Sequence, residues 1–83
     1  MLAEYVNGSP KIGEVVARHM SKKQKDRGIM ITLQTTRWGQ KFGLWMIDRI
    51  PGLDHLTCMM VDLLDTEDEA RKLANEDWVG MGL

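Results

Sequence analysis

The chain has 83 residues, of which 43% are hydrophobic and 28% charged, a balance typical of one small globular domain (residues 1–83) rather than of a disordered chain. Its formal net charge is −1, and no apolar run reaches the roughly 18 residues that cross a bilayer. The N-terminal residues lack the basic and apolar stretches of a signal peptide, and Cys58 is the only cysteine, so we expect no internal disulfide and a cytoplasmic location.

The first strong signal predicts a helix over residues 10–26. Ser9 is a good N-cap, and Pro10 suits the first helical position, where no backbone N–H is needed. Apolar residues then recur at helical spacing, and Gly28 suits the position after the helix. The members of this stripe are Ile12, Val15, Val16 and Met20. Residues 1–8, with Leu2, Tyr5 and Val6, are expected to form a short strand or a strap across the core.

Three strands are predicted next, over residues 29–38, 41–50 and 55–64. The first is rich in β-branched residues and alternates in polarity, and Pro51-Gly52 ends the second. Gly39-Gln40 fits the centre of a two-residue hairpin turn between the first two strands. That turn would place Gln34 opposite Trp45 and Leu33 opposite Met46.

The last predicted element is a helix over residues 66–78. Thr66 with Glu69 forms a capping box, and the clustered acids suit the positive end of the helix. Its apolar stripe consists of Ala70, Leu73, Ala74 and Trp78. Gly80 and Gly82 favour a loose tail.

The order of elements predicts an α+β fold of the type α-β-β-β-α, with a three-stranded antiparallel sheet and two helices packed on one face. Two helices can cover only one face of such a sheet, so the other face is expected to be open to solvent. The residues assigned to this open face and its hairpin are Thr32, Gln34, Thr36, Arg37, Trp38, Lys41, Trp45, Ile47 and Arg49.

We interpret this open face as a partner-binding surface, because tryptophan and arginine are favoured at the energetic centres of interfaces. One alternative is that residues 1–8 fold back and cover Trp45 with Tyr5 and Val6. A second alternative is a homodimer formed through the same face. Trp38, beside the turn, could also be a partly exposed aromatic without a partner.

Charge is segregated along the chain. Residues 10–28 hold six basic residues against two acidic ones, whereas residues 62–77 hold seven acidic against two basic. The alternative charged binding residues are Lys22, Lys23, Lys25 and Arg27. With Arg37, Lys41 and Arg49 they suggest a nucleic-acid-binding domain, although a solvated helix end that complements the helix dipole is the favoured explanation of the basic segment.

No catalytic, metal-binding or cofactor-binding constellation is recognisable. His19 and His55 have no metal-ligand spacing, Cys58 on a strand is typical of a small buried residue, and no phosphate-cradling loop motif occurs. We therefore predict a protein that is not an enzyme and that holds no cofactor and no metal.

Three resemblances follow from these features. The predicted order of elements resembles the double-stranded-RNA-binding domain, but acidic residues in 66–72 replace the lysines with which that family grips phosphates. The segment 64–70 looks like the strand-to-helix junction of three-stranded DNA-binding domains that read the major groove with the sheet. There, Arg37, Lys41, Trp45 and Arg49 would make the contacts.

The overall profile is similar to small accessory proteins of phages and mobile elements, including anti-CRISPR proteins. That resemblance rests on size, a near-neutral isoelectric point, the segregation of charge along the chain and the absence of catalytic motifs. It implies a protein-binding inhibitor or accessory factor whose partner is a host or phage protein or a nucleoprotein complex, with nucleic acid as the alternative and no membrane.

Overall fold

The computed structural model describes residues 2–4, 12–49, 52 and 56–83, and within them the chain forms a five-stranded sheet followed by one helix. The strands are β1 (Leu2–Glu4), β2 (Glu14–Met20), β3 (Gly28–Thr36), β4 (Gly39–Asp48) and β5 (Leu56–Leu64), and the helix is α1 (Glu67–Gly80). The predicted three-stranded sheet with two helices on one face is therefore wrong, because the first predicted helix is a strand.

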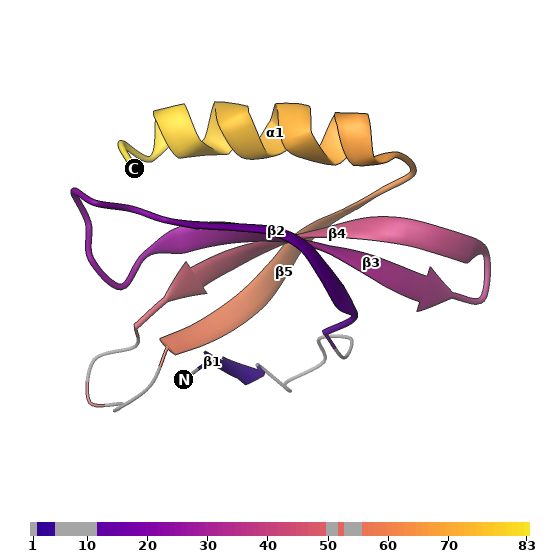
Figure 1. Ribbon diagram of the computed structural model, residues 1–83, viewed down its shortest axis with the longest axis horizontal. Coiled ribbons are helices and arrows are strands. Elements are labelled where there is room, and N and C mark those ends of the chain that lie inside the picture. The colour runs from indigo at the N-terminus through magenta and orange to yellow at the C-terminus, as the bar shows by residue number, and fades with distance from the viewer. Residues whose placement is uncertain (1, 5–11, 50–51, 53–55) are drawn as a thin grey trace.

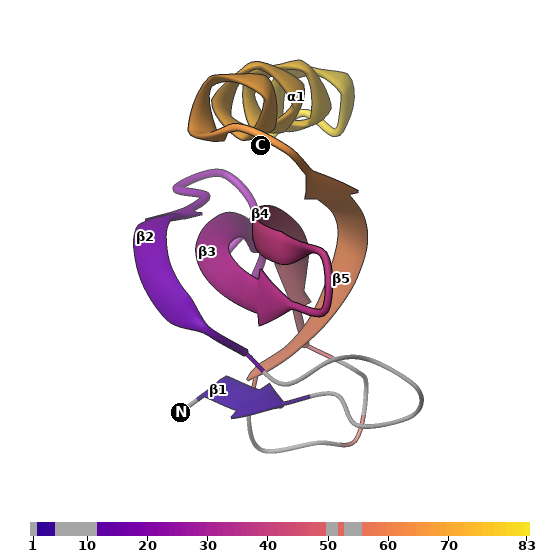
Figure 2. The same ribbon diagram turned by 90° about the vertical axis from the view of Figure 1, so that its right-hand side faces the viewer.

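The sheet has the strand order β1-β5-β4-β3-β2. Strands β2 to β5 form an antiparallel meander, and β1 adds to the outer side of β5 in parallel. Figure 1 shows α1 lying along one side of the twisted sheet, and Figure 2 shows β2 and β5 flanking the central β3–β4 hairpin on its two sides. The short N-terminal strand expected from the sequence corresponds to β1, whereas Tyr5 and Val6 lie outside the described residues.

Strand β2 occupies the region in which a helix was predicted. It pairs with β3 from Glu14 to Met20, and its register shifts between Val15 and Ala17, as in a β-bulge. A bulge interrupts the two-residue alternation of a strand. The apolar residues of this segment were therefore spaced like those of a helix, and pairing with β3 overrode that local pattern.

The β3–β4 hairpin turns earlier than predicted. Thr36 pairs with Gly39, so Arg37 and Trp38 form the turn in place of Gly39-Gln40, and Gln34 opposes Lys41. Gly39 has φ +104°, a backbone conformation that glycine adopts without strain. The register differs from the predicted one by four positions, and because four is even, the side chains within β3 and β4 keep their predicted faces.

Helix α1 begins as predicted, with Thr66 as its N-cap. The Thr66 hydroxyl accepts a hydrogen bond from the Glu69 backbone N–H at 3.2 Å and donates one to the Glu69 carboxylate at 3.0 Å. This satisfies one of the backbone donors left free at a helix start.

The C-terminal end of α1 is ordered, in contrast to the loose tail expected from its glycines. Gly82 has φ +70°, its N–H donates to Val79 O at 3.1 Å, and the Leu83 N–H donates to Trp78 O at 3.0 Å. This pair of bonds is the Schellman arrangement, which turns the chain back over the helix end. Leu83 is consequently buried.

Two apolar clusters lie on opposite faces of the sheet. The cluster under α1 contains the buried residues Ile29, Ile31, Leu44, Ala70 and Leu83. The cluster on the other face contains the buried residues Met30, Trp45, Ile47 and Cys58, with Ile12, Met20, Leu56 and Met60 packed against it. The described helix is neither long nor apolar enough to cross a membrane.

Candidate functional site

The sheet face that was predicted to be open is closed around Trp45. The side chains of Trp45 and Thr32 are 0% exposed and that of Gln34 is 6% exposed. Thr32, Gln34 and Trp45, which were interpreted as exposed partner-contacting residues, are therefore buried in this structure, although they do share one face as predicted. Ile47, on the same face, is also fully buried.

These buried polar groups bond to one another. The Trp45 indole N–H donates to the Thr32 hydroxyl at 2.8 Å, and that hydroxyl donates to the Gln34 side-chain oxygen at 2.6 Å. The Gly13 backbone N–H donates to the same oxygen, also at 2.6 Å. A polar group can be buried at little cost when it is hydrogen-bonded, so this chain of bonds explains how a polar strand face becomes interior.

Two glycines allow the close packing of this face. A Cβ added at Gly13 would lie 2.2 Å from the Leu33 backbone oxygen, and one added at Gly43 would lie 3.0 Å from the Trp45 indole nitrogen. Both positions thus lack room for a side chain unless neighbouring atoms move. Neither glycine was recognised from the sequence as a packing residue.

The hairpin tip carries the other predicted tryptophan, and there the prediction of exposure holds. Trp38 is 75% exposed, and the Arg37 guanidinium lies 5.6 Å from the centre of its ring. The turn is braced by the Thr36 hydroxyl, which accepts from the Trp38 N–H at 3.1 Å and donates to Gly39 O at 2.7 Å. Arg37, Trp38 and Thr36 therefore lie together at one projecting end of the sheet.

Three of the predicted binding cations are engaged in ion pairs. Lys41 pairs with Asp65, Arg49 pairs with Asp26 at 2.9 Å, and the Arg27 Nε lies 3.5 Å from an Asp48 carboxylate oxygen. Each pair is at least partly exposed, so each stabilises the fold only modestly. Of the open-face cations, Arg49 follows the end of β4 that pairs with Gly28, so it lies at the opposite end of the hairpin from Trp38.

The remaining predicted cations, Lys22, Lys23 and Lys25, lie on the loop between β2 and β3. All three are exposed, and no ion pair of theirs occurs within the described residues. They do not sit at a helix end of their own, since residues 21–27 form a loop.

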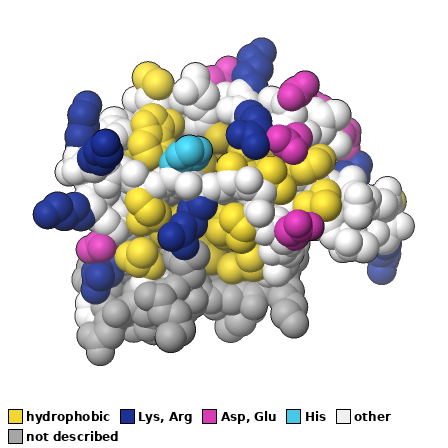
Figure 3. All heavy atoms as spheres, viewed as in Figure 1, with side chains coloured by type: hydrophobic (Ala, Val, Ile, Leu, Met, Phe, Trp, Pro, Cys, Tyr) yellow, Lys and Arg dark blue, Asp and Glu magenta, His cyan; other side chains and the backbone are white. Residues whose placement is uncertain are grey.

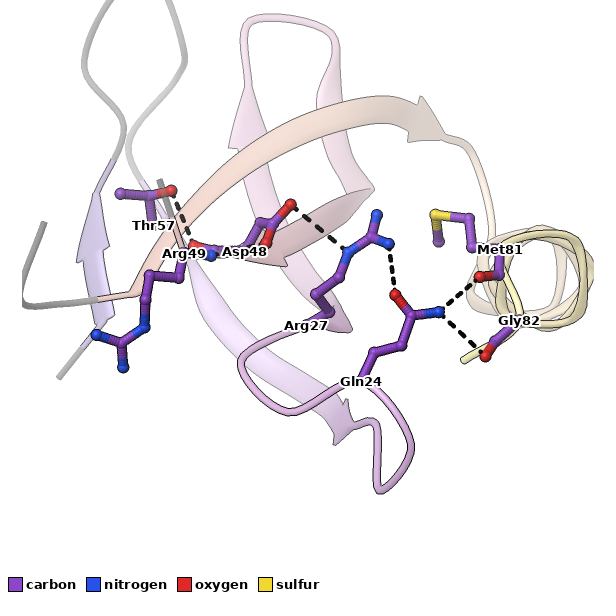
Figure 4. Close-up of polar contacts among 7 residues, drawn as sticks. All are labelled: Gln24, Arg27, Asp48, Arg49, Thr57, Met81 and Gly82. Atoms are coloured by element: carbon purple, nitrogen blue, oxygen red, sulfur yellow. Dashed lines mark hydrogen bonds and ion pairs between the residues drawn. The ribbon is translucent and has the colours of Figure 1, made fainter. Parts of the chain in front are cut away.

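This loop is tied to the end of α1. The Ser21 hydroxyl donates to Leu83 O at 3.1 Å, and the Gln24 amide donates to Met81 O at 2.9 Å and to Gly82 O at 3.2 Å. Figure 4 shows Gln24 reaching the helix end on one side and accepting from Arg27 on the other, at 2.7 Å. The last turn of α1 has no basic residue that could bond to the carbonyl groups at the end of the helix. The Gln24 amide instead donates to the carbonyl oxygens of Met81 and Gly82, just after the helix.

A cavity of about 590 Å³ lies between α1 and the strands β2 and β3, beside this loop. Its floor is formed by residues that are buried or partly buried, and its rim by exposed basic or polar ones. The floor residues are Ala17, Met20, Ile29, Ile31, Ala74, Trp78 and Leu83. The rim residues are His19, Lys22, Lys23, Arg71 and Asn75.

This cavity was not predicted from the sequence. It unites residues from β2, the following loop, β3 and α1, and the His19 and Trp78 rings meet in a T-shaped arrangement at a centroid distance of 6.5 Å. On the face shown in Figure 3, hydrophobic side chains surround the histidine below the helix, and basic side chains project at the left-hand end. The only sequence signal was the helical spacing of Arg71, Ala74 and Trp78, which indicates a shared side of the helix.

The described residues include no group of three or more His, Cys, Asp and Glu side chains that could hold a metal ion. Cys58 is buried in the Trp45 cluster, and His55 lies outside the described residues. The predicted absence of catalysis, metal and cofactor stays a prediction.

We compared the chain with known protein families, curated proteins and solved structures. The chain matches no family model, no curated protein and no solved structure.

Proposed function

We propose that this chain is a non-catalytic binding module that docks a partner protein through the tip of the β3–β4 hairpin. The observation that carries the proposal is the 75% exposure of Trp38, because tryptophan side chains are on average largely buried in folded proteins. Its neighbour Arg37 lies against the same ring. Tryptophan and arginine are the residue types most enriched among those that dominate binding energy.

The geometry of the tip also favours binding, because the indole is presented on a braced turn. The Thr36 hydroxyl bonds both to the Trp38 N–H and to Gly39 O, which holds the backbone around the ring. A preorganised side chain loses little conformational freedom when it is buried by a partner. The proposed surface is therefore smaller than the predicted sheet face and lies at its end.

The partner class rests on the sequence resemblance alone. Similarity to anti-CRISPR and other accessory proteins extends the proposal to an inhibitor or accessory factor of phage or mobile-element origin, which stays a prediction. The resemblance to the double-stranded-RNA-binding domain loses its architectural basis, because that family's first helix is matched here by β2. The likeness of 64–70 to sheet-type DNA readers loses Trp45 as a contact, since that indole is buried.

The test is capture of partner proteins on the immobilised chain, quantified by mass spectrometry, with Trp38→Ala and Arg37→Ala compared with the unmodified protein. We expect Trp38→Ala to weaken capture of the specific partner about thirtyfold or more, in the range found for residues that dominate interfaces (about 2 kcal/mol or more). Val79→Ala is the matched control, because Val79 is an apolar residue with a similar exposure of 72% on α1.

Both tip variants should unfold at the same urea concentration as the unmodified chain, since they alter exposed side chains. Capture at an unchanged level by both Trp38→Ala and Arg37→Ala would contradict the hairpin-tip proposal. If Val79→Ala loses capture and the tip variants do not, the interface lies on α1 and not at the hairpin tip.

A second candidate, nucleic-acid binding, is favoured by one observation: the exposed lysines Lys22, Lys23 and Lys25 share one loop. A salt titration of binding to duplex DNA and to RNA tests it, because affinity that depends on several phosphate contacts falls steeply with salt concentration. The absence of binding at low salt would remove this candidate.

A further inference from the structure

We propose that the cavity between α1 and β2 is a binding site for a small amphipathic carboxylate, such as a medium-chain fatty acid. The inference is independent of the hairpin-tip function, since Arg37 and Trp38 are not among the cavity residues. It rests on three properties of the cavity: its volume, the chemistry of its floor and the sign of the charges at its rim.

The volume of about 590 Å³ lies within the range of cavities that bury small ligands. Arg71 and Trp78 both line it and are seven residues apart on α1, so the helical rise gives the cavity a length of about 10 Å along the helix. These dimensions suit a short chain or a ring system with one polar end.

The floor is apolar and is formed in part by buried core residues. Ile29, Ile31 and Leu83 are 5%, 4% and 7% exposed, and Ile29 and Ile31 lie on β3, which pairs with β4 on one side and β2 on the other. The Trp78 ring closes one wall, where it meets the His19 ring. An apolar ligand body placed here would be removed from water, which is the main source of affinity for such ligands.

The rim is basic, and none of the described residues that line the cavity is acidic. Lys22 and Lys23 stand at one end of it and have no ion pair within the described part of the chain. Arg71 also reaches the rim, but its Nε already donates to the Glu67 carboxylate at 2.7 Å. The positive charge that is free to meet a ligand therefore comes mainly from the two lysines.

This asymmetry sets the orientation of the ligand. Its carboxylate is placed at the Lys22 and Lys23 end, and its apolar body extends over Ile29 and Ile31 toward Arg71. The Lys23 backbone N–H is not available, because it donates to the Ser21 hydroxyl at 3.1 Å. The ammonium groups of the side chains thus make the polar contacts, as charge-assisted hydrogen bonds.

The experiment uses decanoate, below its micelle concentration, titrated into the ¹⁵N-labelled chain. Each tryptophan indole gives its own N–H resonance, and the three occupy different environments: Trp78 in the cavity, Trp45 in the opposite cluster and Trp38 at the hairpin tip. We expect the Trp78 resonance to shift with saturation while the other two stay in place. Calorimetry gives the affinity.

Two comparison ligands test the charge. Decanol carries the same chain without the carboxylate, and decyltrimethylammonium carries the opposite charge. We expect decanol to bind at least tenfold more weakly than decanoate and the cation not to bind. Equal affinity for decanol and decanoate would overturn the assignment of a carboxylate ligand.

Two sets of variants test the location. The double variant Lys22→Ala/Lys23→Ala should weaken decanoate binding about tenfold or more without changing decanol binding, whereas Lys25→Ala, on the same exposed loop but outside the cavity, is the matched control. Ala74→Trp should fill the cavity and abolish binding of both ligands.

Persistence of the Trp45 resonance shows that each variant is folded. Unchanged decanoate affinity in the lysine double variant, or the absence of any Trp78 shift with the unmodified chain, would overturn the proposal. Trp38→Ala should bind decanoate normally, so failure of the hairpin-tip proposal and failure of this one are distinguishable.

Discussion

The two faces of the β3–β4 hairpin are closed by different means. On one face, Ile29, Ile31 and Leu44 pack under α1, and a cavity remains beside the helix. On the other face, Trp45 and Ile47 are fully buried, and the described residues packed against their cluster come from the segments of β2 and β5.

The difference lies in polarity. The helix-covered cluster is apolar, whereas the Trp45 face also buries Thr32 and Gln34 in a chain of hydrogen bonds. Polar residues on a strand face therefore do not by themselves indicate contact with water. Where they bond to one another and to an indole N–H, they belong to the interior and depend strongly on each other.

The substitution with the largest expected effect on stability removes the side chain at the centre of the Trp45 face. We expect Trp45→Ala to lower the free energy of unfolding by about 3–5 kcal/mol, because it leaves a cavity and removes the donor to Thr32. The measurement is urea unfolding followed by circular dichroism.

Trp38→Ala is the control for this change, since it removes the same side chain from an exposed site and should alter stability by less than about 0.5 kcal/mol. If Trp45→Ala does not fold, Trp45→Phe keeps most of the volume and still removes the hydrogen bond. Equal effects of the Trp38 and Trp45 truncations would show that the second face is open after all.

A smaller substitution tests how much the buried hydrogen bonds on this face contribute to stability. Thr32→Val preserves shape but deprives the Trp45 N–H of its acceptor and the Gln34 oxygen of a donor. We expect a loss of about 1–3 kcal/mol in the free energy of unfolding, the cost of leaving buried polar groups without partners.

Thr35→Val is the matched control for Thr32→Val, because Thr35 is exposed on the same strand. Strands favour β-branched residues of both kinds, so this control should be nearly neutral. A neutral Thr32→Val would mean that the indole and amide find other partners and that the chain of bonds is dispensable.

The helix-covered face can be tested at the end of α1, with the smallest expected effect. Gly82→Ala places a side chain at φ +70°, so we expect a loss of about 1–2 kcal/mol and weaker burial of Leu83. Gly80→Ala lies within the helix, where an added Cβ meets no atom within 4 Å, and should stabilise by about 0.5–1 kcal/mol.

Opposite signs for the two glycine substitutions in thermal unfolding would support the ordered helix end. If both substitutions stabilise the chain, the turn around Gly82 contributes nothing and the tail is loose, as its glycines alone had suggested.

Part of the candidate site was predictable from the sequence. The exposure of Trp38 was predicted from its position beside a hairpin turn. The residues of β3 and β4 that share a face were also predicted, although the predicted register was wrong by four positions. The cavity was not predictable, because Lys22, Lys23 and Trp78 are brought together only when the loop after β2 bonds to the end of α1.

The sequence by itself determined the local elements whose signals agree with their neighbours: the alternating strands β3, β4 and β5, and α1 with its Thr66 cap. Only the tertiary structure decided that residues 14–20 form a strand and that the Trp45 face is interior. The physical reason is the same in both cases. A bulged edge strand and a hydrogen-bonded polar face are stabilised by partners distant in sequence, so their local patterns resemble an amphipathic helix and a solvated surface.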